Sequence, residues 1–502
     1  MSIYIGLKEK ISSLKYDRIL DFFSGLLLLL LFLSAITRLD SAWDSLAYHL
    51  PFAARQAGII SPDELRISQF LEQLYQGVPI LAETLQGSLW RITGWITATN
   101  LISWGSLVIF IVVAALRLDL SFWKLTLLSL SVPLILLQSI TSYNDLINGC
   151  FIALGIVGLF AAVKNDSYNL RNYFFTLFPI MLSTNVKYQA LPVGLFYTII
   201  VIFVFLWKNW NRLILNKRPS NFLISFILIT VFLGAVGGFT LFKNFYFHHN
   251  PVYPLPLKIG PIEFPSNYTD LEFDVSMSEK LKDLPRFQIY LISLSEIYLW
   301  TDNNGQLWGI GGMPGSLSEN IFFKLGGFFV ANLILWSIFL LTVFSYNPSK
   351  KKNFYFIVLI TSFLFVGFLP SSGLLRYWLF LPLVFILVVL LFYEELDNSQ
   401  SLLKTMFVFI QLMLFAFVTY QNIDVYKFRE RFNQTVTHDV SYAYLQTTYH
   451  LEDMDSSVCI VHSRDNRLAF LYKITNMSFS IQDARSASDC IYENILILDQ
   501  SQ

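Results

Sequence analysis

Long apolar runs recur along this chain, and they constrain its fold more than any other feature. A helix needs about 20 predominantly apolar residues to cross the hydrocarbon core of a bilayer. Eleven runs approach this length, and they are Ile19–Ile36, Ile96–Leu116, Phe122–Ile140, Leu146–Val163, Tyr173–Val186, Ala190–Trp207, Phe222–Phe242, Leu325–Phe344, Phe354–Leu369, Leu374–Tyr393 and Leu402–Val418. The sequence therefore predicts an all-α polytopic membrane protein with about eleven transmembrane helices.

The overall composition agrees with this prediction and excludes other classes of protein. Hydrophobic residues make up 55% of the 502 residues and charged residues only 14%, whereas soluble domains hold about 25% charged residues. One soluble globule could not bury so much apolar surface. The 35 basic and 35 acidic residues balance, and no basic run is interleaved with aromatic residues, so nothing indicates nucleic-acid binding.

The three cysteines are too few for a disulfide scaffold or a zinc site. Cys150 lies in an apolar run, where we expect an inert core residue. Cys459 and Cys490 both lie in the polar C-terminal segment. They would pair if that segment faces an oxidising compartment, and the sequence leaves this pairing open.

The distribution of basic residues predicts which side of the membrane each loop occupies. A basic N-terminal segment precedes the first apolar run, and no convincing small-residue cleavage site follows it. We therefore expect an uncleaved first span with a cytoplasmic N-terminus. The turns Ser142–Asp145 and Pro370–Gly373 hold no Lys or Arg, which predicts an outer position. Eleven spans in a plasma (inner) membrane then place the C-terminal segment on the periplasmic or extracellular side.

Three segments are too polar to cross the membrane. Residues 38–94 are amphipathic and favour helices along the membrane surface as a first outer loop. Residues 243–323 form a second outer loop that is too long for a simple connector. Its Gly309–Gly315 turn does not join a strand to a helix, so it does not predict a nucleotide-phosphate loop.

The C-terminal segment differs in character from the rest of the chain. Its short apolar runs, such as Val458–Val461 and Ile495–Leu498, predict a small soluble α/β appendage. The predicted organisation is therefore a transmembrane domain over residues 1–420 and a small non-cytoplasmic domain over residues 421–502.

Polar residues gather at the predicted outer face, and this gathering is the main functional signal. Asp44 and Tyr48 are four residues apart, so a helix starting there would place both on one face. Ionisable groups at a membrane boundary are costly and mark candidate functional sites. The other candidates at this face are His49, Asn144, Asp145, Lys187, Lys243, Asn244 and Arg376.

Each candidate also has a purely structural interpretation. Asp44 and Asp145 would serve as helix N-caps. Lys187 and Lys243 would extend to lipid headgroups, Arg376 would anchor its span or pair with an acid, and the histidines would be ordinary core or loop residues. Two acids and several cations on one face instead favour a site that removes a proton from an acceptor and neutralises a phosphate leaving group.

These residues occur in an order that resembles the GT-C superfamily of membrane glycosyltransferases. The run Asp44–Pro51 (DSLAYHLP) resembles the superfamily's first outer loop, and Asn144–Asp145 resembles its second acidic position. Asn185–Tyr188 (NVKY) resembles the segment in which a basic residue, here Lys187, often follows a short fifth span. Lys243–Pro254 is similar to a stretch of many bacterial members, and Leu375–Tyr377 (LRY) to their late Arg-Tyr pair. The C-terminal segment carries no such resemblance.

The resemblance implies an enzyme similar to the protein O-mannosyltransferase or lipid A aminoarabinose transferase type, with a site that opens to the non-cytoplasmic side. The donor would be a polyisoprenyl-phosphate-linked sugar, and the acceptor an envelope lipid, glycan or protein. Asp44 would be the general base of an inverting hexosyl or pentosyl transfer. Asp145 would orient its surroundings or help to hold a metal. Some superfamily members use a divalent cation and others do not, so the metal stays open.

The same resemblance assigns the remaining candidates to substrate binding. Lys187, Lys243 and Arg376 would hold the phosphate, since Arg binds it bidentately and Lys as a point charge. Asp40 lies close to Asp44 in the sequence and is an alternative catalytic acid. The residues expected to line the substrate site are Tyr48, His49, Asn144, Asn244 and Tyr377.

Two other functions fit parts of the sequence. A polymerase or ligase that transfers whole glycans from a polyprenyl diphosphate would rely on basic residues and histidines of the outer loops rather than on Asp44. A non-enzymatic flippase or transporter would carry functional charges within its spans, which are almost uncharged here. The glycosyltransferase hypothesis therefore fits the sequence best.

Overall fold

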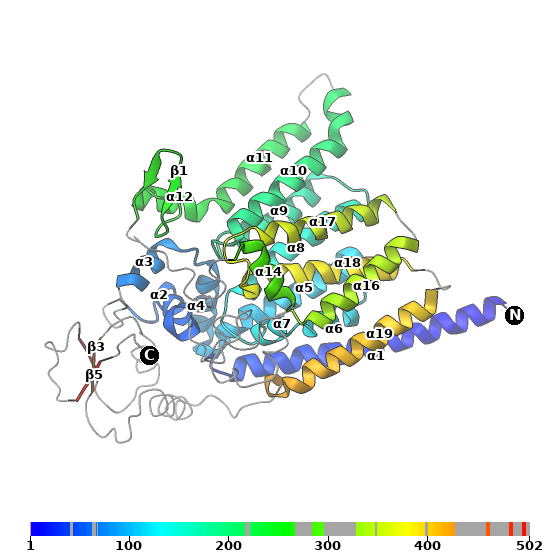
Figure 1. Ribbon diagram of the computed structural model, residues 1–502, viewed down its shortest axis with the longest axis horizontal. Helices are drawn as coiled ribbons and strands as arrows, with labels where there is room; N and C mark the ends of the chain where they lie inside the picture. Colours follow the sequence, from blue (N-terminus) through cyan, green and yellow to red (C-terminus); the bar gives the residue numbers. More distant parts are fainter. Residues whose placement is uncertain are drawn as a thin grey trace.

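The helices lie side by side in a bundle that carries three smaller helices at one end (Figure 1). The computed structural model describes residues 2–40, 44–62, 67, 69–215, 221–266, 284–295, 328–346, 349–396, 400–426, 458–461, 481–484 and 494–497. The smaller helices α2 (Leu50–Gln56), α3 (Gln69–Gly77) and α4 (Leu81–Thr93) lie opposite the N-terminus of α1 (Ser2–Thr37) (Figure 1). The first predicted outer loop is therefore helical, and α2 is buried against α4.

The remaining helices of the bundle lie largely within the predicted apolar runs. They are α5 (Leu101–Leu118), α6 (Phe122–Leu130), α7 (Pro133–Gln138), α8 (Asp145–Lys164), α9 (Leu170–Ser183), α10 (Ala190–Leu215), α11 (Asn221–Gly237), α12 (Phe239–His248), α16 (Val330–Tyr346), α17 (Lys350–Gly367), α18 (Phe380–Glu394) and α19 (Ser401–Gln421). Another helix, α14 (Arg286–Ser295), lies within the second predicted loop. The shorter turns are η1 (Ser45–His49), which is π-helical, and the 3-10 turns η2 (Ile96–Asn100), η5 (Leu375–Trp378) and η7 (Ile423–Tyr426).

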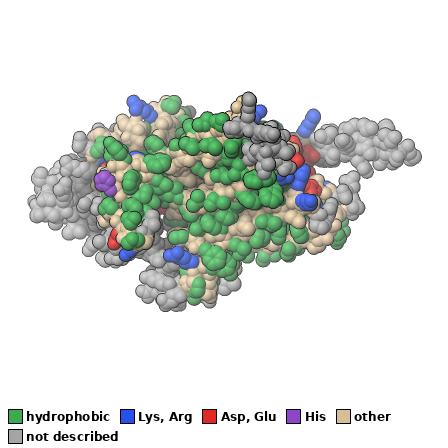
Figure 2. Space-filling model, turned by 90° about the horizontal axis from the view of Figure 1, so that it is seen from above, with side chains coloured by type: hydrophobic (Ala, Val, Ile, Leu, Met, Phe, Trp, Pro, Cys, Tyr) green, Lys and Arg blue, Asp and Glu red, His purple; other side chains and the backbone are tan. Residues whose placement is uncertain are grey.

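Within the described part of the chain, five helices are long and apolar enough to cross a membrane, or six if the bent pair α11–α12 forms one span. Hydrophobic side chains cover the middle of the face in Figure 2, as a lipid-facing surface requires. Each of the eleven predicted runs contains a helix. Two of the runs are broken, and α16 and α18 are short. The structure is thus that of a helical membrane protein, while the number eleven stays a prediction.

The run Phe122–Ile140 was expected to be one helix, and it is broken at Pro133 instead. Proline has no amide hydrogen and disfavours the helical conformation of the preceding residue, so α6 ends before it and α7 begins at it. The Ser131 carbonyl at the break accepts a hydrogen bond from Asn332 Nδ2 at 2.8 Å. Gln411 Nε2 donates to the Ser131 hydroxyl at 2.9 Å. A side chain of α16 therefore satisfies a backbone carbonyl at the break, and one of α19 satisfies the neighbouring hydroxyl.

The run Phe222–Phe242 is also divided, and its two parts α11 and α12 meet at an angle of 56° next to Gly238. Asn185 bridges the bend from both sides. Its Nδ2 donates to the Val236 carbonyl at 2.7 Å, and its Oδ1 accepts from the Thr240 amide at 3.2 Å. Thr184 donates to the Gly237 carbonyl at 2.8 Å. Backbone groups freed by a bend at membrane depth need such partners, so these two side chains stabilise it.

Helix α8 lies at the centre of the bundle, and 89% of its apolar stretch is buried inside the protein. Glycines let its neighbours approach closely. A Cβ atom at Gly155 would stand 2.6 Å from the Thr176 carbonyl oxygen of α9, and one at Gly158 would stand 2.9 Å from Thr176 Cα. A Cβ atom at Gly149 would meet the Phe380 amide nitrogen at 3.0 Å. The N-terminal half of α8 is thereby held against the turn that connects η5 to α18.

Charged side chains of separate loops meet at the end of the bundle away from α2–α4. Lys124 pairs with Glu394 at 2.9 Å, Lys164 with Asp119 at 3.0 Å, and Lys351 Nζ donates to the Lys164 carbonyl at 2.6 Å. Under the positive-inside rule, basic loops share one side of a membrane. The structure brings these basic loops together at one end of the bundle.

The described strands form two small sheets. In the hairpin of β1 (Leu257–Ile259) and β2 (Ile262–Phe264), Gly260 takes a φ of +58°, which suits a tight two-residue loop. The C-terminal strands β3 (Val458–Val461), β4 (Ile481–Ala484) and β5 (Asn494–Ile497) form a parallel sheet in the order β4-β3-β5. The predicted α/β domain over residues 421–502 stays a prediction. Cys490 and the Gly309–Gly315 turn lie outside the described residues.

We expect Gly155→Ala to destabilise the protein, because the added Cβ atom would overlap the backbone of α9. Overpacking of this kind costs about 1–3 kcal/mol. Gly105 in α5 is the matched control, since a Cβ atom there meets nothing within 4 Å. Thermal unfolding in detergent should show a lower midpoint for Gly155→Ala than for the wild type. The midpoint of Gly105→Ala should be unchanged. Equal midpoints for the two variants would contradict the close packing of α8 on α9.

Candidate active site

Asp44, the first predicted acid, forms a buried ion pair with Arg376, which lies 332 positions further along the chain. Arg376 Nη1 donates to Asp44 Oδ2 at 2.8 Å, and both side chains are about nine-tenths buried. Asp44 precedes η1, but its carboxylate makes no capping hydrogen bond. The interpretation of Asp44 as a helix cap is therefore wrong, because the carboxylate is engaged with the guanidinium of η5.

The second predicted acid pairs with the lysine that follows the fifth run. Asp145 is the first residue of α8 and is fully buried, and its Oδ1 accepts a hydrogen bond from Lys187 Nζ. The position at a helix N-terminus also favours a negative charge. Lys187 is therefore not extended to lipid headgroups, because it lies against this buried carboxylate.

An aromatic ring joins the two ion pairs into one cluster. Lys187 Nζ lies 4.0 Å from the centroid of the Tyr377 ring, and the Arg376 guanidinium lies 5.1 Å from it. The Arg376 guanidinium also lies 5.5 Å from the centroid of the Tyr143 ring. It interacts electrostatically with the Asp145 carboxylate as well. We call Asp44, Arg376, Asp145, Lys187 and Tyr377 the charge cluster. It holds two carboxylates and two cations from four separate segments of the chain.

Two tyrosines next to the charge cluster are neutral hydrogen-bond donors. Burial, followed by the Asp44 carboxylate, raises the pKa of the Tyr48 hydroxyl well above its usual value. The same two causes, in the same order, raise the pKa of the Tyr143 hydroxyl. Both groups stay protonated over the physiological range of pH, so neither supplies a base.

Asp40, the alternative catalytic acid, joins η1 to the turn Ser142–Asp145 before α8. Its Oδ2 accepts hydrogen bonds from the Ser45 hydroxyl at 2.5 Å, the Ser142 amide at 2.8 Å and the Ser142 hydroxyl at 3.0 Å. Gln86 of α4 donates to the Ser142 carbonyl at 2.6 Å. The turn before α8 is therefore fixed to η1 and α4, which places Asp145 next to the segment that carries Asp44.

His49 and Asn144 meet on a glutamate of α4. His49 Nδ1 donates to Glu83 Oε1 at 2.7 Å, and Asn144 Nδ2 donates to the same oxygen at 3.3 Å. All three side chains are at least nine-tenths buried. His49 also lies beside the rings of Tyr48 and Tyr143, with centroid distances of 4.3 and 5.7 Å. We call His49, Glu83 and Asn144 the acceptor cluster.

Lys243 and Asn244 do not join either cluster. Lys243 Nζ donates to the Gln76 carbonyl at the end of α3, at 2.6 Å. Asn244 Nδ2 donates to the carbonyls of Gly77 and Tyr253, at 2.7 and 3.1 Å. Their contacts attach α12 to α3 and to the start of the second loop. The hydroxyl of Tyr188, the residue after Lys187, donates to the same two carbonyls.

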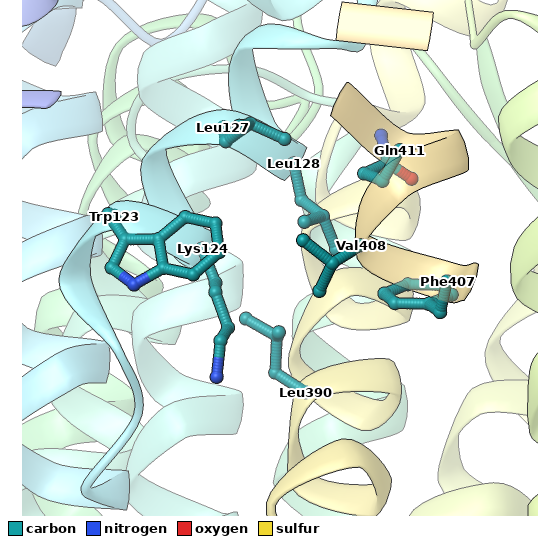
Figure 3. Close-up of a pocket in the computed structure, with 8 residues that line it drawn as sticks. All are labelled: Trp123, Lys124, Leu127, Leu128, Leu390, Phe407, Val408 and Gln411. Carbon is teal, nitrogen blue, oxygen red and sulfur yellow. The ribbon is translucent and has the colours of Figure 1, made fainter. Parts of the chain in front are cut away.

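A pocket in another part of the protein contains none of the predicted site residues (Figure 3). It lies between α6, α18 and α19, and its lining is mostly apolar. Lys124 is its charged lining residue, and this lysine pairs with Glu394 at the end of the bundle away from α2–α4. In the described part of the chain, no group of three or more His, Cys, Asp or Glu side chains is arranged to hold a metal ion.

Glu83 is a residue of the acceptor cluster that the sequence pattern did not single out. A signal for it is present in the sequence. Ala82, Glu83, Gln86, Gly87 and Trp90 form the buried face of α4, so a carboxylate and an amide stand on a face that is otherwise apolar. Such a face must supply polar partners elsewhere in the fold. The partners themselves, His49 and the turn before α8, are known only from the tertiary structure.

No family model and no curated protein matches the sequence. The structure resembles a crystal structure of ArnT from Cupriavidus metallidurans bound to undecaprenyl phosphate, with a TM-score of 0.50 and 12% identity. That match covers 92% of this chain and 85% of the ArnT chain. The apo state of the same ArnT gives a TM-score of 0.49 with 12% identity, over 93% and 85% of the two chains. The comparison shows that this chain and the ArnT chain share a fold.

We expect the Asp44–Arg376 pair to be energetically coupled. Either single change, Asp44→Asn or Arg376→Met, leaves an uncompensated buried charge, which typically costs about 3–5 kcal/mol. The double variant removes both charges, so its loss of thermal stability in detergent should be smaller than the sum of the two single losses. Asp119→Asn combined with Arg376→Met is the control, because Asp119 is exposed and pairs with Lys164. Additive losses for Asp44 and Arg376 would contradict the ion pair.

Proposed function

We propose that this protein is an integral membrane glycosyltransferase that moves a sugar from a polyisoprenyl-phosphate donor to an envelope lipid, glycan or protein on the non-cytoplasmic face. The charge cluster is the observation that carries this proposal. It combines the buried Arg376 and the partly buried Lys187 with two buried carboxylates around one aromatic ring. Cations at this density suit a phosphate, and a carboxylate beside them suits proton removal.

The phosphate of the donor would bind to Arg376 and Lys187. The guanidinium offers a planar fork for two phosphate oxygens, and the ammonium offers a compact charge. Both cations meet at the Tyr377 ring, so one phosphate group between them would contact both. Lys243, which the sequence analysis grouped with them, is assigned here to the attachment of α12 to α3.

Binding of the phosphate would also prepare the base. Asp44 accepts a hydrogen bond from Arg376 in the structure, and a donor phosphate would compete for the same guanidinium. The released carboxylate would then accept the proton of the acceptor hydroxyl. The acceptor oxygen forms a bond to the anomeric carbon, the bond from that carbon to the phosphate oxygen breaks, and the bonding electrons leave with the phosphate. Direct displacement of this kind inverts the anomeric configuration.

Asp145 would serve a positioning role in this reaction. Its carboxylate is fully buried and holds Lys187 beside Tyr377, so it sets the second phosphate contact rather than taking a proton itself. The positions of the charged residues also favour an enzyme over a transporter. Asp44 precedes η1, Asp145 begins α8, and Arg376 lies in η5 before α18. A transport path would require such charges further along the spans.

The fold supports the same conclusion. The matched ArnT structure is described as bound to undecaprenyl phosphate, which is a polyisoprenyl phosphate. The five to six candidate spans among the described helices agree with a protein that meets such a lipid in the plasma (inner) membrane. We further propose that the C-terminal segment and the charge cluster lie on the outer side, as the basic loops at the opposite end of the bundle suggest.

Replacing Asp44 by Asn should abolish transfer while the protein is still made. Mass spectrometry would be applied to envelope glycans and polyprenyl-linked sugars of a deletion strain. Copies of that strain would carry the wild type, Asp44→Asn or the control Asp119→Asn at matched protein levels. We expect the deletion and Asp44→Asn to share one missing sugar and one accumulated lipid-linked donor. Wild type and Asp119→Asn should restore both.

Other outcomes would redirect the assignment. Full restoration by Asp44→Asn would show that Asp44 is not the base. Accumulation of a whole glycan on a polyprenyl diphosphate would indicate a polymerase or ligase instead. An unchanged set of glycans and lipid-linked sugars in the deletion strain would refute the glycosyltransferase proposal.

A further inference from the structure

The acceptor cluster contains three buried polar atoms that have no hydrogen-bond partner among the described residues. These atoms are His49 Nε2, Glu83 Oε2 and Asn144 Oδ1. The three residues are 2%, 2% and 5% exposed. A buried polar atom without a partner typically costs about 1–3 kcal/mol. What distinguishes these three atoms is that their side chains are bonded to one another, so the three open positions belong to one group.

The hydrogen bonds within the acceptor cluster define what each open atom can do. A carboxylate only accepts hydrogen bonds, so the proton of a neutral His49 lies on Nδ1, which donates to Glu83 Oε1. His49 Nε2 is then a lone-pair acceptor. Glu83 Oε2 is an acceptor by its chemistry, and Asn144 Oδ1 is one because its Nδ2 donates to Glu83. All three open atoms therefore require a ligand that supplies donors.

The requirement for donors separates this cluster from the phosphate position. Phosphate oxygens accept hydrogen bonds, so a phosphate suits Arg376 and Lys187 but is repelled by the acceptor cluster. The two clusters are nevertheless adjacent. Tyr143 lies 5.7 Å from the His49 ring and 5.5 Å from the Arg376 guanidinium, and Asn144 directly precedes Asp145. A ligand held by its phosphate at one cluster would reach the other with the group next to the phosphate.

We infer that the acceptor cluster is a hydroxyl-binding subsite, in which His49 Nε2, Glu83 Oε2 and Asn144 Oδ1 accept hydrogen bonds from hydroxyl groups of the donor sugar. This inference rests on the proposed function and adds to it the part of the site that holds the sugar. Glu83 is also the positioning residue for His49, because its Oε1 bonds Nδ1 and so directs Nε2 away from Glu83. A subsite of acceptors selects a polyol and excludes a second phosphate.

Two variants remove acceptors and keep the internal hydrogen bond. His49→Asn places a side-chain amide near the position of Nδ1, where it still donates to Glu83, and leaves nothing at the position of Nε2. Glu83→Gln keeps an oxygen for His49 and replaces the open acceptor by an NH₂ donor. Because the two changes act on different elements, the second carries the test if the first does not fold, as thermal unfolding would show.

Binding would be measured on the full-length protein in lipid nanodiscs with two probes. One probe is undecaprenyl phosphate, and the other is the polyisoprenyl-phosphoryl sugar that accumulates in the deletion strain. Each variant should bind the sugar-bearing lipid about tenfold more weakly, as the loss of a buried hydrogen bond predicts. Its affinity for undecaprenyl phosphate should stay within about twofold of wild type. His249→Asn is the control, because His249 is exposed and its φ of +55° suits Asn.

The outcomes separate this inference from the proposed function. If both variants bind both probes as the wild type does, or lose affinity for both probes equally, the hydroxyl-binding subsite is refuted. If the wild type binds neither probe, the glycosyltransferase proposal itself fails. Selective loss of affinity for the sugar-bearing lipid supports both.

Discussion

The ion pair between Asp145 and Lys187 requires two distant segments to meet, because the Asp145 side chain is completely buried. A buried charge without a partner is strongly destabilising. The start of α8 and the connection between α9 and α10 must therefore lie together in the folded protein. The second pair, Asp44 with Arg376, adds η1 and η5 to the same place. The close approach of α8 at Gly149 to the turn after η5 makes this meeting sterically possible.

The segment Thr184–Tyr188 stabilises most of the surrounding architecture. Thr184 and Asn185 satisfy the backbone at the bend between α11 and α12. Lys187 neutralises Asp145, and Tyr188 donates to the carbonyls that end α3 and begin the second loop. Four residues of this segment thus tie the bundle, the bent span and the smaller helices to one another. The proposed phosphate contact of Lys187 and the stability of its surroundings therefore depend on the same segment.

The site combines two kinds of chemistry in adjacent clusters. The charge cluster offers cations, which suit a phosphate, and the acceptor cluster offers lone pairs, which suit hydroxyl groups. Asp40 and Ser142 hold the intervening turn in place. This division fits a donor that carries a phosphate and a sugar side by side, and it explains why one end of an otherwise apolar protein contains so many buried polar groups.

The sequence by itself determined the helical membrane class and the positions of the apolar helices, and it supplied all five residues of the charge cluster as candidates. Hydrophobicity and charge are local properties, so they are readable along the chain. Only the tertiary structure decided that Asp44 pairs with Arg376 rather than capping a helix, that Lys243 attaches α12 to α3, and that Glu83 supports His49. Those pairings join residues between 34 and 332 positions apart. They depend on which helix faces touch, and packing rather than local sequence sets those contacts.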